Sequence, residues 1–375
     1  MKKLLLIVFA VVLAVAFCAP AMAATNSATF YGNVRFWNWI VKSDDNFPAY
    51  PFYKQNSGFD DTDLVWSPDI FDNRFGIKLK EGPIKANLEV RPLNGSYFRQ
   101  FWGSYTFGQT EVLMGFTWSP FFCPVTTSIY SAGGLQGDWG DMASCLRSNM
   151  IGFKSNLGFA KMFLALEPPV TSGISDVTAG PAPLQSDFDT YIPRIEVNFT
   201  FNAGPANVGL FGGYNAYKVV DNTDESETIT SNVYGLRLEV PVGPVSARGI
   251  VWNAKNMGNY GYAFGGTQPY FASATFVNGN VEDSSTFGFA LAGSFRFSDM
   301  VSVDLGYGHA KYERYAQEEQ SGSFYYVRFP ITIAKGFTVT PEVGRLALGD
   351  ITDYTGVETS VGNLTWYGLY WQINF

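Results

Sequence analysis

The stretch RFGIKLKEGPIKANLEVR, from Arg74 to Arg91, decides the fold. Its first half alternates apolar residues with lysine, and the turn Glu81-Gly82-Pro83 separates it from a second half with the same alternation. A period of two places successive side chains on opposite faces of a β-strand. The stretch therefore predicts a hairpin with one apolar face and one charged face.

Connections of two lengths follow one another along the rest of the chain. Short turns rich in Gly, Pro, Asp or Asn fall at 81–83, 108–109, 156–158, 202–205, 242–244, 298–299 and 334–336. The polar segments between them are mostly long, and 92–96 is the short member. A soluble β-sandwich also shows alternation within its strands, but short turns that alternate with longer loops are typical of bacterial outer-membrane barrels.

We therefore predict an all-β fold, a closed sixteen-stranded antiparallel transmembrane β-barrel with short periplasmic turns, mostly longer extracellular loops and an inward-folded third loop. The apolar faces would contact lipid, and the charged faces would line a water-filled interior, because buried charges require water or partners. The predicted strands begin near Thr29, Asn73, Ile84, Phe98, Glu111, Arg147, Phe159, Tyr191, Asn207, Ser231, Val245, Thr286, Val301, Gly322, Phe337 and Asn363.

The first residues predict export. Two lysines precede an apolar run at 4–17, and the small-residue sequence Ala21-Met22-Ala23 follows, which is the order of a cleaved secretory signal. We expect a signal peptide at 1–23 and a barrel domain at 24–375, located in the bacterial outer membrane after cleavage.

Composition favours a membrane environment and argues against nucleic acid. The chain holds 33 Phe, 21 Tyr and 9 Trp but only 15% charged residues, so many rings must face an apolar medium. The formal net charge is -8, whereas phosphate binding requires clustered Lys and Arg. We therefore expect outer-membrane lipid and lipopolysaccharide as partners, and no nucleic acid.

Four segments carry a family resemblance. They are the opening TFYGNVRFW, the hairpin NRFGIKLKEGPIKANLEVR, the following FRQFWGSYTFGQTEVLMGFTWSP and the closing GLYWQINF. The first three resemble the general porins of the Gram-negative outer membrane. The last is similar to their C-terminal signature for the barrel-assembly machinery, with one face formed by Tyr367, Leu369, Trp371, Ile373 and Phe375. The resemblance implies a homotrimer and a third extracellular loop folded into the lumen, although loop 92–96, which latches many trimers, is short here.

The third loop, 119–146, would bring opposite charges together across the pore. Its acidic residues would be Asp138 and Asp141. Basic residues of the first four strands would face them from the wall: Arg35, Arg74, Lys78, Lys85, Arg91 and Arg99. Such a field orients dipolar solutes and favours small polar molecules. The simpler alternative is that these residues only hydrate a wide lumen.

Two cysteines remain after the signal is removed with Cys18. Cys123 and Cys145 bracket the third loop, and the expected compartment is oxidising. A disulfide between them would stabilise the protein by roughly 3 kcal/mol on the chain-entropy model. The alternative is two unpaired thiols.

No metal, cofactor or catalytic centre is expected. The acidic runs at 60–63 and 221–227 lack the spacing of a defined cation loop, so solvated loop tips explain them better than bound divalent cations. The single histidine, His309, is the candidate for an enzyme, the rival class. On its own strand Asp304 and Ser302 are too distant for a catalytic pair, which favours a rim position.

The sequence thus predicts a pore for passive diffusion of small hydrophilic solutes and ions, with a slight preference for anions. One alternative is a substrate-specific channel for a sugar or organic anion, in which Tyr31, Trp37 and Trp39 form an aromatic track on the luminal face of the first strand. An outer-membrane hydrolase is a third, weaker hypothesis.

Overall fold

The computed structural model describes residues 27–43, 62–68, 73–91, 97–121, 123–129, 140–141, 147–171, 175–176, 187–220, 226–260, 273–277, 280–314, 319–352, 357–359 and 362–375. The predicted signal peptide, loop 92–96, Asp138 and Cys145 lie outside these ranges. Among the described residues, no helix has the length and apolarity that a membrane span requires.

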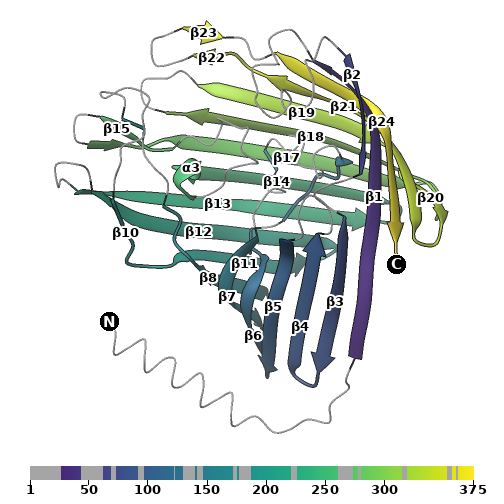
Figure 1. Ribbon diagram of the computed structural model, residues 1–375, viewed down its shortest axis with the longest axis horizontal. Helices are drawn as coiled ribbons and strands as arrows, with labels where there is room; N and C mark the ends of the chain where they lie inside the picture. The colour runs from purple at the N-terminus through teal and green to yellow at the C-terminus, as the bar shows by residue number, and fades with distance from the viewer. Residues whose placement is uncertain are drawn as a thin grey trace.

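Antiparallel strands form one closed wall (Figure 1). The ring closes where β1 pairs with β3 on one side and with the last strand, β24, on the other. Three positions in the wall each consist of two successive segments, namely β2 with β3, β10 with β11, and β19 with β20. The 19 strands of this sheet therefore occupy sixteen positions, which confirms the predicted barrel.

The wall strands are β1 (Ser27–Ser43), β2 (Thr62–Pro68), β3 (Arg74–Glu81), β4 (Ile84–Arg91), β5 (Tyr97–Phe107), β6 (Thr110–Trp118), β7 (Arg147–Asn156), β8 (Lys161–Glu167), β10 (Asp187–Asp189), β11 (Arg194–Ala203), β12 (Ala206–Val220), β13 (Ser226–Val242), β14 (Val245–Lys255), β17 (Ser285–Arg296), β18 (Ser302–Glu313), β19 (Gln320–Arg328), β20 (Ile331–Ala334), β21 (Phe337–Leu348) and β24 (Asn363–Asn374).

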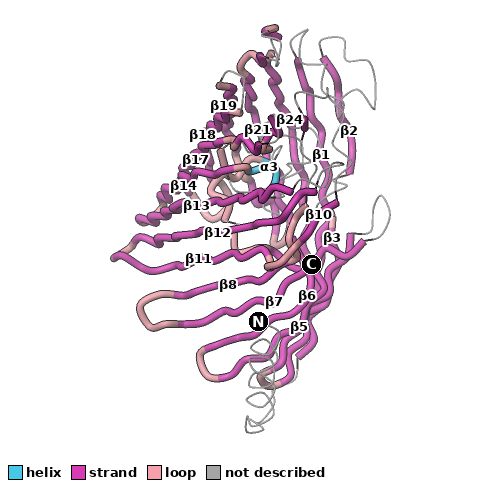
Figure 2. Tube along the Cα trace, turned by 90° about the vertical axis from the view of Figure 1, so that its left-hand side faces the viewer, coloured by secondary structure: helices cyan, strands magenta, loops and turns pink. Residues whose placement is uncertain are grey.

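Smaller elements lie in segments that the sequence assigned to loops. They are β9 (Ser175–Asp176), β15 (Thr275–Val277), β16 (Asn280–Glu282), β22 (Ile351–Thr352), β23 (Glu358–Thr359) and the helix α3 (Met257–Tyr260). The segment β2, which the sequence also assigned to a loop, extends the wall beside the upper part of β1. Figure 2 shows the strands around the ring from the side.

Short turns join neighbouring strands where they were predicted. Gly82 and Gly204 have φ of 53° and 62°, a left-handed conformation that glycine adopts without strain. No atom lies within 4 Å of a Cβ built on Gly204, so backbone conformation, and not space, selects glycine there. These turns fix the register of the hairpins on either side.

The outer face of the wall is apolar. Phe30, Leu79 and Phe101 are large exposed hydrophobic side chains of β1, β3 and β5. The five residues predicted as the C-terminal signature are exposed on the same face of β24 and beyond it: Tyr367, Leu369, Trp371, Ile373 and Phe375. A wall that exposes its hydrophobic side chains outward is suited to contact with lipid.

Candidate functional site

Cross-strand pairing identifies the inner face of the first strands. Tyr370 of β24 belongs to a buried cluster that includes the third-loop residue Ile129, so it lies inside the ring. Tyr370 pairs with Trp37, and directly paired residues share a face. Because side chains alternate along β1, Arg35 and Tyr31 also face the interior.

Three of the six predicted basic side chains, Arg74, Lys78 and Lys85, face this interior. Lys78 is exposed, and its Nζ lies 4.8 Å from the centroid of the Tyr31 ring. Lys85 Nζ lies 2.7 Å from Glu111 Oε2, and both groups are partly exposed. Arg74 Nη1 lies 3.9 Å from Glu89 Oε2. We call this surface of β3 and β4 the open wall.

Glu89 is the acidic centre of the open wall, and the sequence interpretation did not include it. Its carboxylate accepts hydrogen bonds from Tyr31 Oη at 3.0 Å and from Arg99 Nε at 2.9 Å. Glu89 lies on the same face of β4 as Lys85 and Arg91, and this shared charged face is the signal that could have identified it. A carboxylate with several donors holds the surrounding cations in fixed positions.

Two of the predicted lumen cations are not open to solutes. Arg99 is only 2% exposed because its guanidinium packs against Glu89, and Arg91 is buried as well. Arg35 is partly buried, with its guanidinium carbon 6.0 Å from the centroid of the Tyr370 ring. The prediction that all six line the open lumen is therefore wrong for Arg91 and Arg99.

The described part of the third loop lies inside the ring against strands β11 to β21. At its root, the carbonyl of Pro120 accepts a hydrogen bond from Asn198 Nδ2 at 2.9 Å. Phe121, Cys123 and Val125 then pack in a buried cluster with inner-face residues of β12 to β17 and with α3: Phe211, Val233, Ile250, Trp252, Ala254, Met257, Tyr260 and Ala290. These contacts hold the described part of the loop against the inner face of the wall.

A buried glutamate of β21 holds the far end of this loop segment. Glu342 accepts hydrogen bonds from the Ile129 backbone N–H at 2.7 Å and from Ser128 Oγ at 2.8 Å. Trp366 Nε1 of β24 donates to the same carboxylate at 2.9 Å. Beside it, Tyr326 Oη accepts from the Thr127 backbone N–H at 2.6 Å. The loop therefore spans the interior from β11 to β21.

Asp141 corrects the predicted charge distribution. Its side chain is 0% exposed, and its carboxylate accepts hydrogen bonds from the backbone N–H groups of Val125 and Thr126 and from Thr126 Oγ1. The carboxylate therefore joins two parts of the third loop and does not face the open wall. The prediction that Asp141 contributes to a field across open water is wrong for this reason.

Cys123 is a free, buried thiol in the structure, and its Sγ donates a hydrogen bond to the Phe121 carbonyl at 3.1 Å. Burial raises the pKa of Cys123 to about 12, and the nearby Asp141 carboxylate acts in the same direction. Because Cys145 lies outside the described residues, the disulfide stays a prediction.

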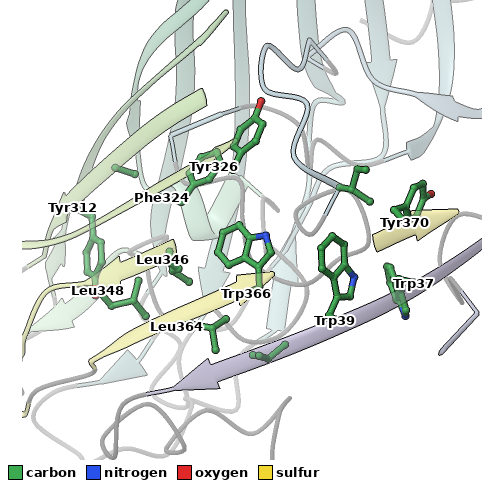
Figure 3. Close-up of a cluster of buried hydrophobic side chains, with 13 residues drawn as sticks. Trp37, Trp39, Tyr312, Phe324, Tyr326, Leu346, Leu348, Leu364, Trp366 and Tyr370 are labelled. Carbon is green, nitrogen blue, oxygen red and sulfur yellow. The ribbon is translucent and has the colours of Figure 1, made fainter. Parts of the chain in front are cut away.

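Two of the three residues of the predicted aromatic track, Trp37 and Trp39, are covered, and the third, Tyr31, is partly buried. Trp37 and Trp39 are 3% and 0% exposed, and they pack inside the barrel with Phe324, Tyr326 and residues of β21 and β24 (Figure 3). A solute cannot slide over rings that other side chains cover. Burying a large aromatic side chain instead stabilises the wall by roughly 2–3 kcal/mol.

His309 points outward. It alternates with the inward Gly308 and Ala310, and the Phe289 ring lies beside its own, with 5.7 Å between the centroids. The structure brings one serine to it from the neighbouring strand: Ser323 Oγ lies 2.8 Å from His309 Nδ1. The described residues contain no cluster of three His, Cys, Asp or Glu side chains suited to a metal ion.

A closed barrel with an apolar exterior, a charged interior and a loop across its lumen has the architecture of outer-membrane channels. Solved structures agree. The outer membrane channel DcaP of Acinetobacter baumannii has a TM-score of 0.66 and 15% identity over 93% of this chain and 97% of that chain. The anion-selective porin from Comamonas acidovorans has a TM-score of 0.59 and 13% identity over 94% of this chain and 100% of that chain.

OmpT of Vibrio cholerae in its trimer form has a TM-score of 0.60 and 12% identity over 94% of this chain and 100% of that chain. No protein-family model matches the chain, and no curated protein sequence matches it. At these identities the likeness establishes the fold: the chain has the sixteen-stranded fold of outer-membrane porins.

Proposed function

We propose that this protein is a porin of the bacterial outer membrane, a water-filled pore for passive diffusion of small hydrophilic solutes and ions. The observation that carries the proposal is the inverted wall, apolar outside and charged inside, around a closed barrel. A sixteen-stranded barrel is wide enough to hold an aqueous channel. Solutes would pass between the open wall and the third loop.

An anion preference follows from the pairing of the inner charges. Glu89, Glu111 and Glu239 each form a salt bridge with a basic side chain of the wall. Lys78 forms no salt bridge with any described residue, so the open wall carries excess positive charge. The similar Comamonas acidovorans structure is described as an anion-selective porin.

Reconstitution in planar bilayers tests this function. We expect steady conductance, solute leakage limited by size, and a reversal potential across a salt gradient that favours anions. Protein that stays soluble without detergent and gives no conductance would contradict the proposal.

Three further parts of the proposal concern assembly. Signal cleavage after Ala23 would release the mature chain for the periplasm, and the outward face of β24 would be recognised by the barrel-assembly machinery. A homotrimer is supported by the trimer form of the similar Vibrio cholerae protein. Mass measurement of the native protein in detergent, before and after heating, tests both the mature mass and the trimer.

A disulfide between Cys123 and Cys145 would tether the third loop in the oxidised protein. Its formation removes two hydrogens, so intact masses of non-reduced and reduced protein should differ accordingly. Equal masses would exclude the bridge.

A further inference from the structure

We propose that the lumen contains a binding subsite for small aromatic carboxylates, in a hollow beside the open wall; this inference rests on the proposed porin function. The hollow has a volume of about 640 Å³ and lies between β5 to β8, β11 and the root of the third loop. Its lining includes Gln100, Trp102, Lys154, Lys161, Phe163 and Asn198.

Cross-strand pairing places the central side chains in one row. Glu111 pairs with Lys154, Lys154 with Phe163, and Phe163 with Asn198. Alongside this row Gly152 has no side chain, and a Cβ there would lie only 2.9 Å from Phe163 Cε2. The ring of Phe163 therefore lies over the Gly152 backbone.

The floor of the hollow is aromatic. Trp102 and Phe163 are partly buried and pack against a small apolar cluster formed by Leu113, Met150 and Ala165. Partial burial fixes the two rings while leaving surface for a ligand. Flat rings of this kind bind a second aromatic ring in offset or edge-to-face geometry.

The rim of the hollow is basic. Lys154 Nζ lies 4.7 Å from the centroid of the Phe163 ring, directly beside the floor. Glu111, the carboxylate in the same row, is already bonded to Lys85 at 2.7 Å. Neither Lys154 nor Lys161 forms a salt bridge with a described residue. The ammonium groups of Lys154 and Lys161 therefore stand next to an aromatic surface, and the nearby Glu111 carboxylate offsets part of the Lys154 charge.

Gln100 adds a neutral donor. Its Oε1 accepts hydrogen bonds from Trp102 Nε1 and Thr117 Oγ1, both at 3.2 Å, which orients the amide and leaves its nitrogen to donate. Ammonium and amide donors bind a carboxylate, and the floor binds a flat ring. Both requirements are met by an aromatic carboxylate. Because these contacts remain partly hydrated, we expect a dissociation constant for the aromatic carboxylate on the order of millimolar, which still allows the ligand to leave the subsite.

Block of single-channel current by benzoate tests the subsite, with acetate and benzyl alcohol as partial ligands. In the wild type, benzoate should block at lower concentration than either. The double variant Lys154→Gln/Lys161→Gln should raise the half-blocking concentration of benzoate about fivefold, as expected for two partly hydrated charge contacts. Trp102→Leu should raise it by about fivefold for benzoate and leave acetate unchanged.

Lys80→Gln is the control for general charge loss, since it removes one positive charge from the inner face of β3 outside the hollow. It should leave benzoate block unchanged. An equal loss in Lys80→Gln and in the double variant would overturn the subsite in favour of general attraction. A conducting channel that benzoate never blocks would overturn the subsite alone, whereas absence of conductance would overturn the pore itself.

Discussion

The inner face of β3 and β4 presents Lys78 and Lys85 to the lumen, whereas the inner face of β12 to β14 presents Phe211 and Trp252 to the third loop. The two regions share the same strand geometry and the same apolar exterior. They differ in what covers the inner face, which is water on the open wall and loop side chains on the other. The strand geometry therefore fixes which residues point inward. Whether those residues are charged or apolar depends on whether water or the third loop contacts them.

The largest effect is expected where the loop is held to the wall. Glu342→Ala removes the acceptor for Ser128, Ile129 and Trp366, and a buried donor without a partner is costly. The free energy of unfolding in detergent should fall by about 3 kcal/mol, and current noise should increase as the loop loosens. Glu239→Ala, which removes a partly exposed glutamate of the inner wall, should cost less than about 1 kcal/mol. Equal losses would show that Glu342 does not anchor the loop.

A smaller loss of stability is expected for Asp141→Asn. The amide keeps one acceptor oxygen, so the backbone donors of Val125 and Thr126 lose part of their bonding, at about 1–2 kcal/mol. Reversal potential across a salt gradient should not change, because the carboxylate is buried. A shift toward anions would show that Asp141 does face the pore.

The open wall should control selectivity instead of stability. Replacing Arg74, Lys78 and Lys85 together with Gln should lower the anion-to-cation permeability ratio by about threefold, because the field in the lumen loses positive charge. Reversal potentials measure this ratio. Arg345→Gln removes a charge from the outer face of β21 and should leave the ratio unaltered; a comparable change there would assign selectivity to the overall charge.

The burial of Cys123 in the third loop should be detectable by thiol labelling. With a pKa of about 12, Cys123 in the reduced folded protein stays protonated at pH 8, where iodoacetamide should label it only after unfolding. An unfolded thiol ionises near its ordinary pKa of 9.0, so the contribution of Cys123 to stability is complete below that pH and is lost as pH rises toward 12. The pH dependence should be weaker in Cys123→Ala; rapid labelling of the folded protein would contradict burial.

The smallest effect is expected at the outer wall. His309→Ala should leave conductance unchanged, because the side chain points away from the lumen. A fluorophosphonate should not label Ser323, since the Ser323–His309 contact lies on a continuous strand pair with its backbone groups in the sheet. Labelling that disappears in His309→Ala would instead support the hydrolase.

Much of the fold was predictable because its signals are local. Alternation in 74–91 gave both faces of the first hairpins, and turn glycines such as Gly82 gave the connections. The segment β2 was missed because Asp60, Asp61 and Asp63 mark this stretch as a polar loop, and its described residues pair with β1 across the wall. Strand number and side-chain face therefore follow from sequence neighbours, and exact pairing does not.

The site was less predictable because its contacts are distant in sequence. Glu342 meets Ile129 only in the folded barrel, and Arg99 is buried only because Glu89 lies beside it. Asp141 has the same charge whether it faces water or binds the loop backbone. Sequence alone could place these charges inside the barrel but could not say which of them water reaches.

The described part of the third loop is attached to β11 through Pro120 and to β21 through Glu342, so we expect the passage for solutes to lie off the barrel axis. A diffusing molecule would travel along one side of the barrel and sample the side chains of that side far more often than those opposite. A bulky label attached at Lys78 should therefore obstruct transport directly. The same label near Trp252 would disturb the packing of the loop against the wall and so impair folding. Permeability and stability could therefore be changed separately on the two sides of the barrel.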